Sequence, residues 1–571
     1  MKNKQVADIL YQIADLLDIK GDIFFKTRAY RIAAQTIEVL DEDIETVVRE
    51  GRLESIQGVG EALAKKIKEI VETGNLEYFE RLKKEIPEGL LELLELPGLG
   101  PKKVAALYKN LNITTVDALR KACIQGKLRD LDGFGEITER NILRGIQLKE
   151  KTSGRVLLNV AYQDGNKYLD YIKKCPEVNN SALAGSFRRK KETIGDLDIL
   201  VSSENPGEVM NYFVKYRDVD RVLMKGPTKT SVLLSDGLQV DLRVVKKESY
   251  GAALQYFTGS KEHNVKMRSI AIKKGYRLNE YGLFEKDTEN FVTGQVEKDV
   301  YSALGLDYIE PELRENMGEI EAASKGKLPQ LVEHKDIRGD LHVHSIYSDG
   351  TDTIENIATC AKKLGYEYVG IADHSESLKI ARGLSEESLI KKQKEISQVN
   401  KKIPGITVLF GTECDIKTDG ALDYPDHILN QFDFVIIGVH TALKMDNKDM
   451  EKRILSGMQN EHANILAHPT GRLIGRREPF KIDIENLIDT AKETNTFLEI
   501  NSFPDRLDLN GIHAKLAKEK GVKCVIGTDA HNIANMSYME FGVATARRGW
   551  QEKSDILNTN NLKDLRKILG R

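Results

Sequence analysis

The chain has 571 residues, too many for one hydrophobic core, and this length predicts roughly three to five folded units. Its formal net charge of −3 excludes a strongly basic protein, so any binding of nucleic acid must depend on local basic patches and helix dipoles. The five cysteines form no C-x-x-C pair, which argues against a disulfide framework or a zinc ribbon. Without a membrane-length apolar stretch or a secretion signal, we expect a cytoplasmic protein that does not contact membranes.

Residues 1–85 and 86–150 are predicted to be two helical regions. In the first, apolar residues recur at helical spacing between Val6 and Leu17, and a second helix is expected from about Ala29 to Leu40. Both regions contain short turns with paired glycines followed by lysines, namely Gly58 and Gly60, Gly98 and Gly100, and more weakly Gly133 and Gly135.

These turns have a helix-hairpin-helix pattern. A helix that begins at such a turn directs its backbone N–H groups and the positive end of its dipole toward a phosphate. A single Gly-x-Gly turn often only joins two helices, but two such turns favour sequence-independent contact with a DNA backbone, made by Gly58, Gly60, Gly98 and Gly100.

Three acidic residues mark the next region. Asp196 and Asp198 open an apolar run that reads as a buried strand, and their spacing puts both carboxylates on one face. Asp241 lies in a later run that alternates at strand period. Converging carboxylates bind hard divalent ions, so we predict a Mg²⁺ or Mn²⁺ site for two-metal phosphoryl transfer. A solvated acidic strand end is the alternative.

The residues just upstream fit a triphosphate. Gly185 and Ser186 let the backbone approach a phosphate, and four consecutive basic residues could supply cations, namely Arg188, Arg189, Lys190 and Lys191. A further turn, residues 226–230, carries Lys229 as another candidate phosphate ligand.

Two motifs in this region resemble the nucleotidyltransferases and, within them, the family X DNA polymerases related to polymerase beta. They are Gly-Ser-Phe-Arg-Arg followed by Gly-Asp-x-Asp, at 185–198, and Tyr-Phe-Thr-Gly-Ser, at 256–260. The sequence departs from the pattern at Lys190, where vertebrate members have glycine. The resemblance implies a palm over residues 151–245, a thumb over 246–310, and deoxynucleoside triphosphates and gapped or primed DNA as substrates.

The resemblance also assigns individual residues. It implies nucleotide contacts through Gly185, Ser186, Arg189, Tyr256, Phe257, Gly259 and Asn264, and a template contact through Arg268. Two adjacent aromatic side chains beside a glycine can stack under a sugar and exclude a 2′-hydroxyl. The alternative for Tyr256 and Phe257 is a core pair at a helix end, and Arg268 could be an ordinary surface cation.

The polymerase beta resemblance extends into residues 1–85. It implies that Lys26 contacts a 5′-phosphate and that Lys66 is the possible lyase residue, which forms a Schiff base with a deoxyribose phosphate. Crowding by Lys65 and Lys68 would lower the pKa of Lys66, as that chemistry requires. Ala62 stands where the family has a lysine, so part of the lyase pocket is missing, and an exposed helix face is the alternative.

Residues 311–336 are polar and irregular and predict a linker or a wrapping segment, after which a second enzyme begins. Between 337 and 571, apolar strand-like runs repeatedly end in imidazoles or carboxylates, which predicts a β/α barrel with its site at the carboxyl ends of the strands. These nine candidate ligands are His342, His344, Asp349, His374, Glu413, His440, His468, Asp529 and His531.

Nine ligands are too many for one ion, so we expect about two or three metals, Mn²⁺ or Zn²⁺, with Glu413 as the bridge. This region resembles the polymerase and histidinol phosphatase (PHP) domain, which implies metal-dependent hydrolysis of phosphate esters. Arg472, Arg476 and Arg477 follow His468 and could hold a phosphate or form a solvated loop.

Together these patterns predict a multidomain α/β protein: a monomeric, gap-filling DNA repair polymerase of the base excision repair type, associated with the nucleoid, whose barrel is a 3′→5′ exonuclease. One alternative is a barrel that mainly cuts abasic sites or removes 3′-phosphates. Others are a phosphatase for small molecules such as histidinol phosphate tethered to a DNA-binding module, and a template-independent terminal transferase.

Overall fold

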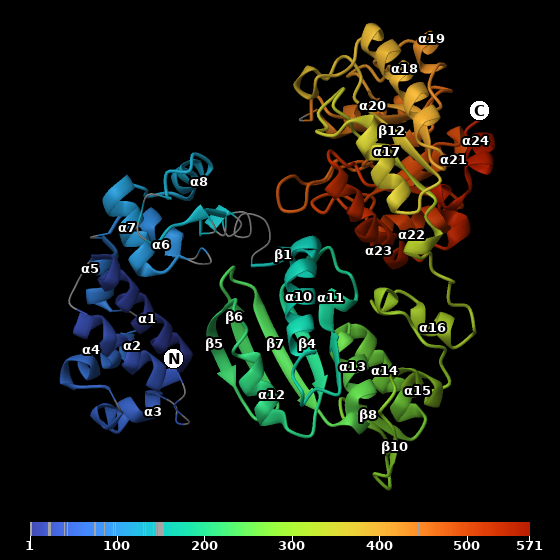
Figure 1. Cartoon of the computed structure of the whole chain (residues 1–571). Helices are drawn as coiled ribbons and strands as arrows, with labels where there is room; N and C mark the ends of the chain where they lie inside the picture. Colours follow the sequence, from blue (N-terminus) through green and yellow to red (C-terminus); the bar gives the residue numbers. More distant parts are fainter. Residues whose placement is uncertain are drawn as a thin grey trace. The chain divides into compact units, whose positions relative to one another are not determined.

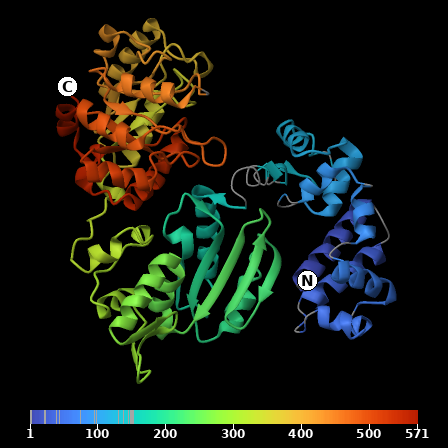
Figure 2. The ribbon, with the colours of Figure 1, turned by 180° about the vertical axis from the view of Figure 1, so that it is seen from behind.

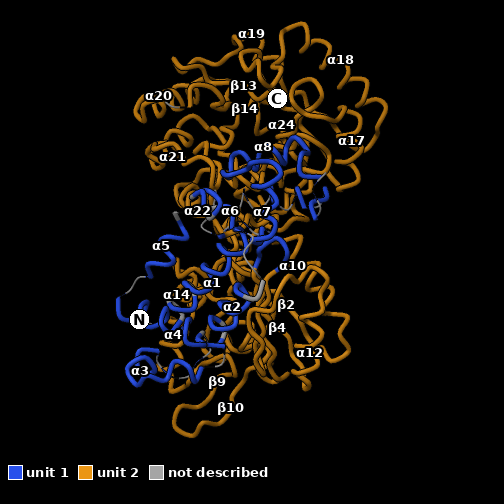
Figure 3. The backbone as a smooth tube through the Cα atoms, turned by 90° about the vertical axis from the view of Figure 1, so that its left-hand side faces the viewer, with its two compact units in different colours: residues 1–154, 234–238 blue, residues 155–233, 239–571 orange. Residues whose placement is uncertain are grey.

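The computed structural model describes residues 3–20, 24–38, 40, 42, 44–56, 58–73, 76–84, 86–94, 96, 99–129, 131, 133–136, 138–140, 142–143, 146, 154–443 and 445–570. The chain divides into two compact units, residues 1–154 with 234–238 and residues 155–233 with 239–571 (Figures 1 and 3). Among the described helices, none combines the length and the apolar character that a membrane span requires.

The first unit is helical. Its helices are α1 (Asn3–Lys20), α2 (Phe24–Glu38), α3 (Ile44–Arg49), η1 (Leu53–Ser55), α4 (Glu61–Thr73), α5 (Glu77–Lys84), α6 (Glu88–Leu94), α7 (Pro101–Leu111) and α8 (Val116–Ile124). Their apolar faces share one core. Helix α2 begins five residues before the predicted Ala29, because the core-facing side extends one turn upstream through Thr27, a buried polar residue that an apolar pattern does not count.

The second unit begins with a five-stranded sheet in the order β2-β4-β7-β6-β5. The elements of this region are β1 (Val156–Leu157), α10 (Leu158–Ile172), β2 (Asn180–Leu183), α11 (Gly185–Arg188), β3 (Thr193–Ile194), β4 (Asp196–Ser202), α12 (Pro206–Phe213), β5 (Val219–Lys225), β6 (Lys229–Leu234) and β7 (Gln239–Val245). Strands β1 and β3 form a separate antiparallel pair. Strands β4 and β7 are parallel, and their register pairs Asp198 with Asp241.

The two faces of this sheet differ. Alternation along β4 puts Leu197 on the face opposite Asp196 and Asp198, and Leu197 packs near Gly165 of α10. Figure 2 shows the sheet from behind, opposite to the view in Figure 1. One face is therefore covered by helix, while the other presents the carboxylates.

A second group of elements follows the sheet: α13 (Tyr250–Thr258), α14 (Lys261–Lys273), β8 (Tyr276–Asn279), β9 (Gly282–Glu285), β10 (Phe291–Thr293) and α15 (Glu297–Ala303). Residues 311–336 contain η3 (Pro311–Leu313), α16 (Glu319–Ala323) and η4 (His334–Asp336). Leu313 and Ile320 are buried in the core of this group, and Val332 is buried in the core of the following barrel. The segment therefore packs against both neighbours.

The remaining residues form a parallel barrel whose seven strands are in sequence order. They are β11 (Gly339–Val343), β12 (Tyr368–Ile371), β13 (Thr407–Asp415), β14 (Phe434–Gly438), β15 (Ile465–Leu466), β16 (Phe497–Asn501) and β17 (Cys524–Gly527). Among the surrounding helices are α17 (Ile354–Lys363), α18 (Glu386–Lys402), α20 (Asn447–Met458), α21 (Ile484–Thr494), α22 (Gly511–Lys520), α23 (Met539–Arg548) and α24 (Leu562–Ile568).

The first and last strands of the barrel are joined just beyond their carboxyl ends. The backbone N–H of His344 donates a 2.8 Å hydrogen bond to the carbonyl of Ala530, and the N–H of Ala530 donates a 3.3 Å bond to the carbonyl of His342. Residues near the start and the end of the barrel sequence thereby meet on the face where the predicted ligands lie.

Candidate functional site

The five-stranded sheet brings three carboxylates together. The side-chain oxygens of Asp196, Asp198 and Asp241 lie within 4.8 Å of one another. Burial and then the charges of Asp196 and Asp241 raise the pKa of Asp198 to about 7. Burial would also raise the pKa of Asp241, but the Lys229 ammonium, 2.6 Å away, holds that pKa below its usual value. Lys229 thus lies in β6 beside a carboxylate, and not in the predicted phosphate-binding turn.

The backbone at position 185 requires a glycine. Its φ of +59° is in the left-handed region, and a Cβ at this position would lie 2.2 Å from an Asp198 carboxylate oxygen. The glycine lets the chain pass directly beside the three carboxylates.

A cleft of about 670 Å³ opens above the carboxylates, and we call it the carboxylate cleft. It is lined by all seven residues with predicted nucleotide contacts and by Arg268, specifically Gly185, Ser186, Arg189, Tyr256, Phe257, Gly259, Asn264 and Arg268. The sequence reasoning missed Arg155, Thr193 and Lys261, which also line it. Arg155 donates to the Thr193 hydroxyl (2.9 Å) and carbonyl (2.6 Å), a contact with no signal in the local sequence.

The four consecutive basic residues do not act as one group. Arg189 and Lys191 line the carboxylate cleft. Arg188 instead makes a two-point ion pair with Glu297 (2.8 and 2.7 Å), and Lys190 is half-buried with its ammonium 4.6 Å from the centre of the Tyr162 ring. Half of the predicted triphosphate cations are therefore used to hold the structure.

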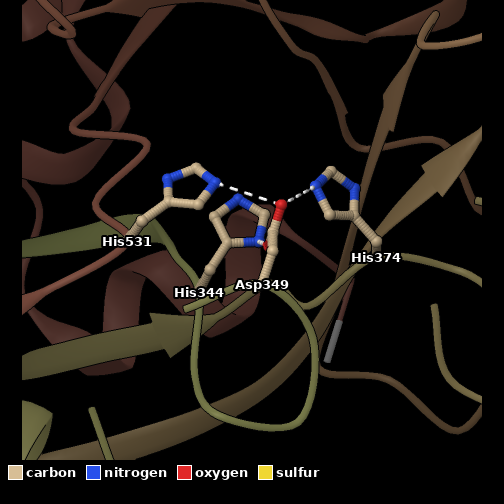
Figure 4. A group of neighbouring side chains, drawn as sticks. All are labelled: His344, Asp349, His374 and His531. Atoms are coloured by element: carbon tan, nitrogen blue, oxygen red, sulfur yellow. Dashed lines mark ion pairs between the residues drawn. The ribbon is translucent and has the colours of Figure 1, made fainter. Parts of the chain in front are cut away.

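The nine predicted barrel ligands also converge, and we call them the barrel cluster. Three overlapping groups have ligand atoms within 4.8 Å of one another: His344, Asp349, His374 and His531; His342, His344 and Asp529; and His374, Glu413 and His440. Figure 4 shows the first group, in which the Asp349 carboxylate pairs with His374 at 3.5 Å and with His531 at 3.4 Å. The shared members, His344 and His374, connect the three groups.

Glu413 of β13 is at the centre of the barrel cluster. Its carboxylate lies between 3.0 and 3.6 Å from five imidazoles, those of His342, His344, His374, His440 and His468. Burial alone would raise the pKa of Glu413, but the surrounding histidines, with His440 foremost, hold it well below its ordinary range.

The donor set fits bound metal ions. His342 Nε2 and both ring nitrogens of His344 are buried and make no hydrogen bond within the described part of the chain. Nitrogen donors left in this way beside carboxylates are suited to divalent transition metals. Gly438 keeps the site open, because a Cβ there would lie 2.8 Å from the His440 ring and 3.2 Å from Glu413.

Several supporting residues were missed from the sequence. Glu499 on β16 accepts a 2.6 Å hydrogen bond from His342 Nδ1 and a 2.7 Å bond from the His468 backbone. Asn501 on the same strand donates to Glu499 and to Asp529. Their signal was available, because 497–501 is another short apolar run that ends in polar residues. Asp415, which orients His440, follows Glu413 at the strand period of two.

The three loop arginines have different environments. Arg472 pairs with Glu192 and also donates to two backbone carbonyls, so protein groups already occupy it. Arg477 donates to the carbonyl of Gly471, and Arg476 lies 3.5 Å from Asp505. Arg506, which the sequence analysis did not single out, lies beside the barrel cluster, with its Nε 3.3 Å from Asp529.

In the first unit, Lys66 is half-buried between the rings of Tyr30 (5.0 Å) and Tyr78 (4.2 Å). Burial, and then the charges of Lys26 and Arg81, lower the pKa of Lys66. The lowered pKa of Lys66 agrees with the prediction, but its cause is burial with Lys26 and Arg81, and not crowding by Lys65 and Lys68. Lys65 and Lys68 point to acidic partners on the exposed face of α4, namely Glu61 and Glu72.

The glycine turns begin helices as predicted. The carbonyl of Gly60 accepts the first hydrogen bonds of α4, and Gly100 is the N-cap of α7 with Pro101 in its first turn. Gly58, Gly60 and Gly100 are exposed. Gly98 lies outside the described residues.

Comparison with known families gives four matches along the chain. Residues 1–76 match a helix-hairpin-helix domain, 90–148 a SAM-like helix-hairpin-helix tandem, 253–315 the DNA polymerase beta thumb, and 340–503 the PHP domain.

Two kinds of relatives were found. A protein of Bacillus subtilis (strain 168) named DNA polymerase/3′-5′ exonuclease PolX is 40% identical over 573 residues, which cover 100% of both chains. A protein of Clostridium acetobutylicum named as a probable phosphatase is 32% identical over 203 residues, 34% of this chain and 78% of that protein. A similarly named protein of Thermoanaerobacter sp. (strain X514) is 30% identical over 232 residues, 39% of this chain and 90% of that protein.

The partial relatives resemble about a third of the chain, whereas the B. subtilis protein matches it from end to end. With the thumb, helix-hairpin-helix and PHP matches in the predicted order, the chain belongs to the family X DNA polymerases that carry a C-terminal PHP domain.

Proposed function

We propose that this protein fills short gaps in DNA by extending a primer with deoxynucleotides in the carboxylate cleft, and that the barrel cluster removes nucleotides from 3′ ends. The observation that carries the first part is the set of three carboxylates at one end of a cleft lined by Arg189, Tyr256 and Asn264. Base excision repair is the pathway that needs such short synthesis. A monomer located with the nucleoid in the cytoplasm is part of the proposal.

In the carboxylate cleft, Asp196, Asp198 and Asp241 would hold two ions, Mg²⁺ or Mn²⁺. When bound, such ions activate a primer hydroxyl and neutralise a leaving pyrophosphate. Arg189 and the backbone at Gly185 and Ser186 bind phosphate oxygens. Tyr256 and Phe257 lie under the sugar, and Asn264 is held beside them because it donates a 2.6 Å hydrogen bond to the Tyr256 carbonyl.

In the barrel, the mixed histidine and carboxylate set would hold a cluster of Mn²⁺ or Zn²⁺ ions, with Glu413 as the shared ligand. Bound there, the ions would supply a nucleophile for cleavage of a phosphate ester. Glu499 and Asp415 fix the orientation of His342 and His440. Abasic-site cleavage, 3′-phosphate removal and hydrolysis of small phosphate esters use the same chemistry, and the Clostridium and Thermoanaerobacter names keep the last of these as an alternative.

A 5′-labelled primer on a one-nucleotide-gapped duplex tests both parts, with manganese and with or without deoxynucleotides. We expect Asp198→Ala to abolish extension alone and His342→Ala combined with His344→Ala to abolish shortening alone. Extension without the template strand would instead indicate a terminal transferase. If the wild type neither extends nor shortens the primer, the proposal fails and small phosphate esters become the substrates to test.

We also propose a deoxyribose-phosphate lyase activity at Lys66. Its support is the lowered pKa of an amine held between two tyrosine rings, because only the unprotonated amine attacks an aldehyde. Borohydride should trap a covalent adduct on an incised abasic site in the wild type and in Lys65→Ala, an exposed neighbour, but not in Lys66→Ala. Trapping that persists in Lys66→Ala removes this assignment.

DNA contacts in the first unit are proposed for Lys26 and for the exposed turn residues Gly58, Gly60 and Gly100. These backbone groups bind phosphate without reading bases, so we expect similar affinity for gapped duplexes of any sequence. Affinity that depended on sequence would contradict this role. Arg268, in the carboxylate cleft, is proposed to contact the template.

A further inference from the structure

A side chain of the barrel reaches the segment that carries Arg189. Arg548 is the last residue of α23, and its Nη1 donates to the backbone carbonyl of Arg189 (2.7 Å) and to Oε1 of Glu315 (3.1 Å). The same Glu315 oxygen accepts a 3.1 Å hydrogen bond from Nε of Arg189. One carboxylate oxygen therefore joins an arginine of the barrel to an arginine of the carboxylate cleft.

This contact is shielded from water. The side chains of Arg189, Glu315 and Arg548 keep only 13%, 17% and 15% of their exposure. Burial would raise the pKa of Glu315, but Arg548 first and then Arg189 hold it below its ordinary value, so the carboxylate is charged. Charge-assisted hydrogen bonds at this level of burial are stronger than those of exposed pairs.

The geometry defines which part of Arg189 can bind a substrate. Its Nε donates to Glu315 and its Nη1 donates to the carbonyl of Thr258. Within the described residues, Nη2 is the one nitrogen of this guanidinium with no protein hydrogen bond, and the side chain lines the carboxylate cleft. The protein contacts thus fix the plane of the guanidinium and leave one edge for a phosphate oxygen.

Arg548 also changes the charge available to that oxygen. Glu315 is near two cations of the cleft, Arg189 at 3.1 Å and Lys191 at 3.8 Å, and it would partly cancel their attraction for a triphosphate. The guanidinium of Arg548 adds a third positive charge around the single carboxylate, so the local charge is more positive than Arg189 and Lys191 alone would make it. Without Arg548, the segment would lose a backbone anchor and the cleft would lose a positive charge.

A second contact holds the same segment three residues further along. Glu192 makes a two-point ion pair with Arg472 of the barrel (3.1 and 2.7 Å), whose Nε also donates to the carbonyl of Arg506 (2.8 Å). Residues 189–192 are therefore attached to the barrel at Arg189 and at Glu192.

We propose that the barrel is a structural part of the nucleotide site, with Arg548 acting through Glu315 as a positioning residue for Arg189, and with Arg472 as a second support of the same segment. This inference rests on the proposed polymerase function. It assigns to the PHP barrel a role in nucleotide affinity that is separate from phosphate ester hydrolysis.

Steady-state extension of a gapped primer tests the proposal, with full-length protein and Mg²⁺. We expect Arg548→Ala to raise KM for the deoxynucleotide about tenfold while kcat stays within about threefold, because a charge-assisted contact to a binding group is lost and the carboxylates are untouched. Arg548→Lys should recover part of the loss, since it keeps the charge. Glu315→Gln removes a charge that opposes the triphosphate, but it also removes the acceptor that fixes Nε of Arg189, and we expect the loss of this anchor to dominate and raise KM. Arg548→Ala should add less to this variant than to the wild type, because the two residues share the Glu315 contact while Arg548 also holds the Arg189 carbonyl.

Arg547→Ala is the matched control. The neighbouring Arg547 also joins α23 to the 311–336 segment, through Glu312 at 2.8 Å, but it touches neither Glu315 nor Arg189. Its KM should stay within about twofold of the wild type, whereas an equal rise in both variants would mean general loosening of the interface and overturn the proposal. Exonuclease activity of Arg548→Ala reports whether the barrel is folded.

The outcomes separate this inference from the function on which it rests. If the wild type does not extend the primer, the proposed polymerase function fails. If the wild type extends it and Arg548→Ala and Glu315→Gln both keep the wild-type KM, only the positioning role fails. If Arg548→Ala does not fold, Arg548→Lys and Glu315→Gln decide, and unchanged KM in both overturns the proposal.

Discussion

In the carboxylate cleft, Asp196, Asp198 and Asp241 face one another with Lys229 as the paired cation, whereas in the barrel cluster three carboxylates lie among six histidines. The pKa of Asp198 is raised to about 7 by burial and by the other two carboxylates, but the pKa of Glu413 is held well below its ordinary range by the imidazoles despite its burial. The three carboxylates of the cleft therefore need added cations before all of them are ionised. In the barrel cluster, the histidines of the protein itself offset the negative charge of the carboxylates.

This difference indicates two ways of holding metals. A site of like charges gains its full negative charge only as cations arrive, so we expect its metals to enter with the nucleotide and leave with the product. A site with matched nitrogen and oxygen donors already in place is expected to keep its ions between reaction cycles.

The variant Glu413→Gln tests this difference most directly, because it removes the central charge of the barrel cluster. We expect 3′→5′ shortening to fall about a thousandfold or more, because the ligand that we propose to be shared between metals is lost, and extension to stay within about twofold. Metal content measured by mass spectrometry after desalting should fall in this variant and stay unchanged in Asp198→Asn. Equal retention of metal by wild type and Glu413→Gln would contradict the central role of this residue.

The second prediction concerns Lys392, a buried cation next to the barrel cluster. Lys392 is fully buried, and its ammonium lies 2.9 Å from Asp373, whose pKa it lowers to about 2 against the effect of burial. Lys392→Met leaves a buried carboxylate unpaired, so we expect the free energy of unfolding of the barrel to fall by about 3–5 kcal/mol in urea titrations.

The exposed neighbour provides the control for this change. Lys391 pairs with Glu387 on the surface of α18, so Lys391→Met should leave the free energy of unfolding nearly unchanged. Equal losses in the two variants would show that burial of the ion pair is not what matters.

A corresponding ion pair supports the carboxylate cleft. Glu297 pairs with Arg188 and Arg314, and although burial would raise its pKa, these arginines, Arg314 first, lower it to about 2. Because this pKa is below the ordinary 4.5, the pair stabilises the fold above pH 4.5, and that contribution is lost as the pH falls toward 2.

Glu297→Gln should therefore lower the free energy of unfolding by about 3 kcal/mol near neutral pH. The difference from the wild type should shrink as the pH falls below 4.5, which thermal unfolding at several pH values can follow. Glu289→Gln, which removes an exposed carboxylate paired with Arg277, should leave the free energy of unfolding nearly unchanged. A constant difference across that range would exclude the ion pair as the cause.

The last prediction concerns selection between deoxyribonucleotides and ribonucleotides by the shape of the site. We expect this selection in the cleft and not in the barrel, and we expect its effect to be smaller than those above. Tyr256→Ala should reduce discrimination against ribonucleotides roughly tenfold, measured as the ratio of kcat/KM values for the two sugars, because the ring no longer fills the space beside the 2′ carbon. Tyr281→Ala, an exposed aromatic of the same region, is expected to leave the ratio unchanged. Unchanged selectivity in Tyr256→Ala would transfer the role to Phe257.

The main features of both sites could be predicted because a short sequence pattern marks each contributing residue. Asp196 and Asp198 share one strand, and their partner Asp241 is in a run with clear alternation, so adjacent parallel strands bring them together. In the barrel, each ligand follows a strand-like run, and parallel strands deliver such residues to one face. Glu499 was missed although its strand has the same pattern.

Other features could not be read from the sequence. The four basic residues from Arg188 to Lys191 look alike in the sequence, but α11 ends at Arg188, Arg189 is its C-cap and Lys190 has a φ of +53°. The backbone therefore turns sharply along this run, and the four side chains have different surroundings. The pairs between Arg472 and Glu192 and between Arg548 and Glu315 join residues more than 200 positions apart, and no local pattern connects them.

The way the barrel closes has a consequence for how the protein is made. His342 lies in the first strand of the ring and His344 follows it directly, and Asp529 and His531 follow the last strand, so the barrel cluster is complete only when both ends of the ring have met. During translation, His344 is synthesised long before Asp529. A nascent or truncated chain that ends before β17 therefore holds an incomplete set of ligands, and we expect such fragments to lack the hydrolytic activity proposed for the barrel.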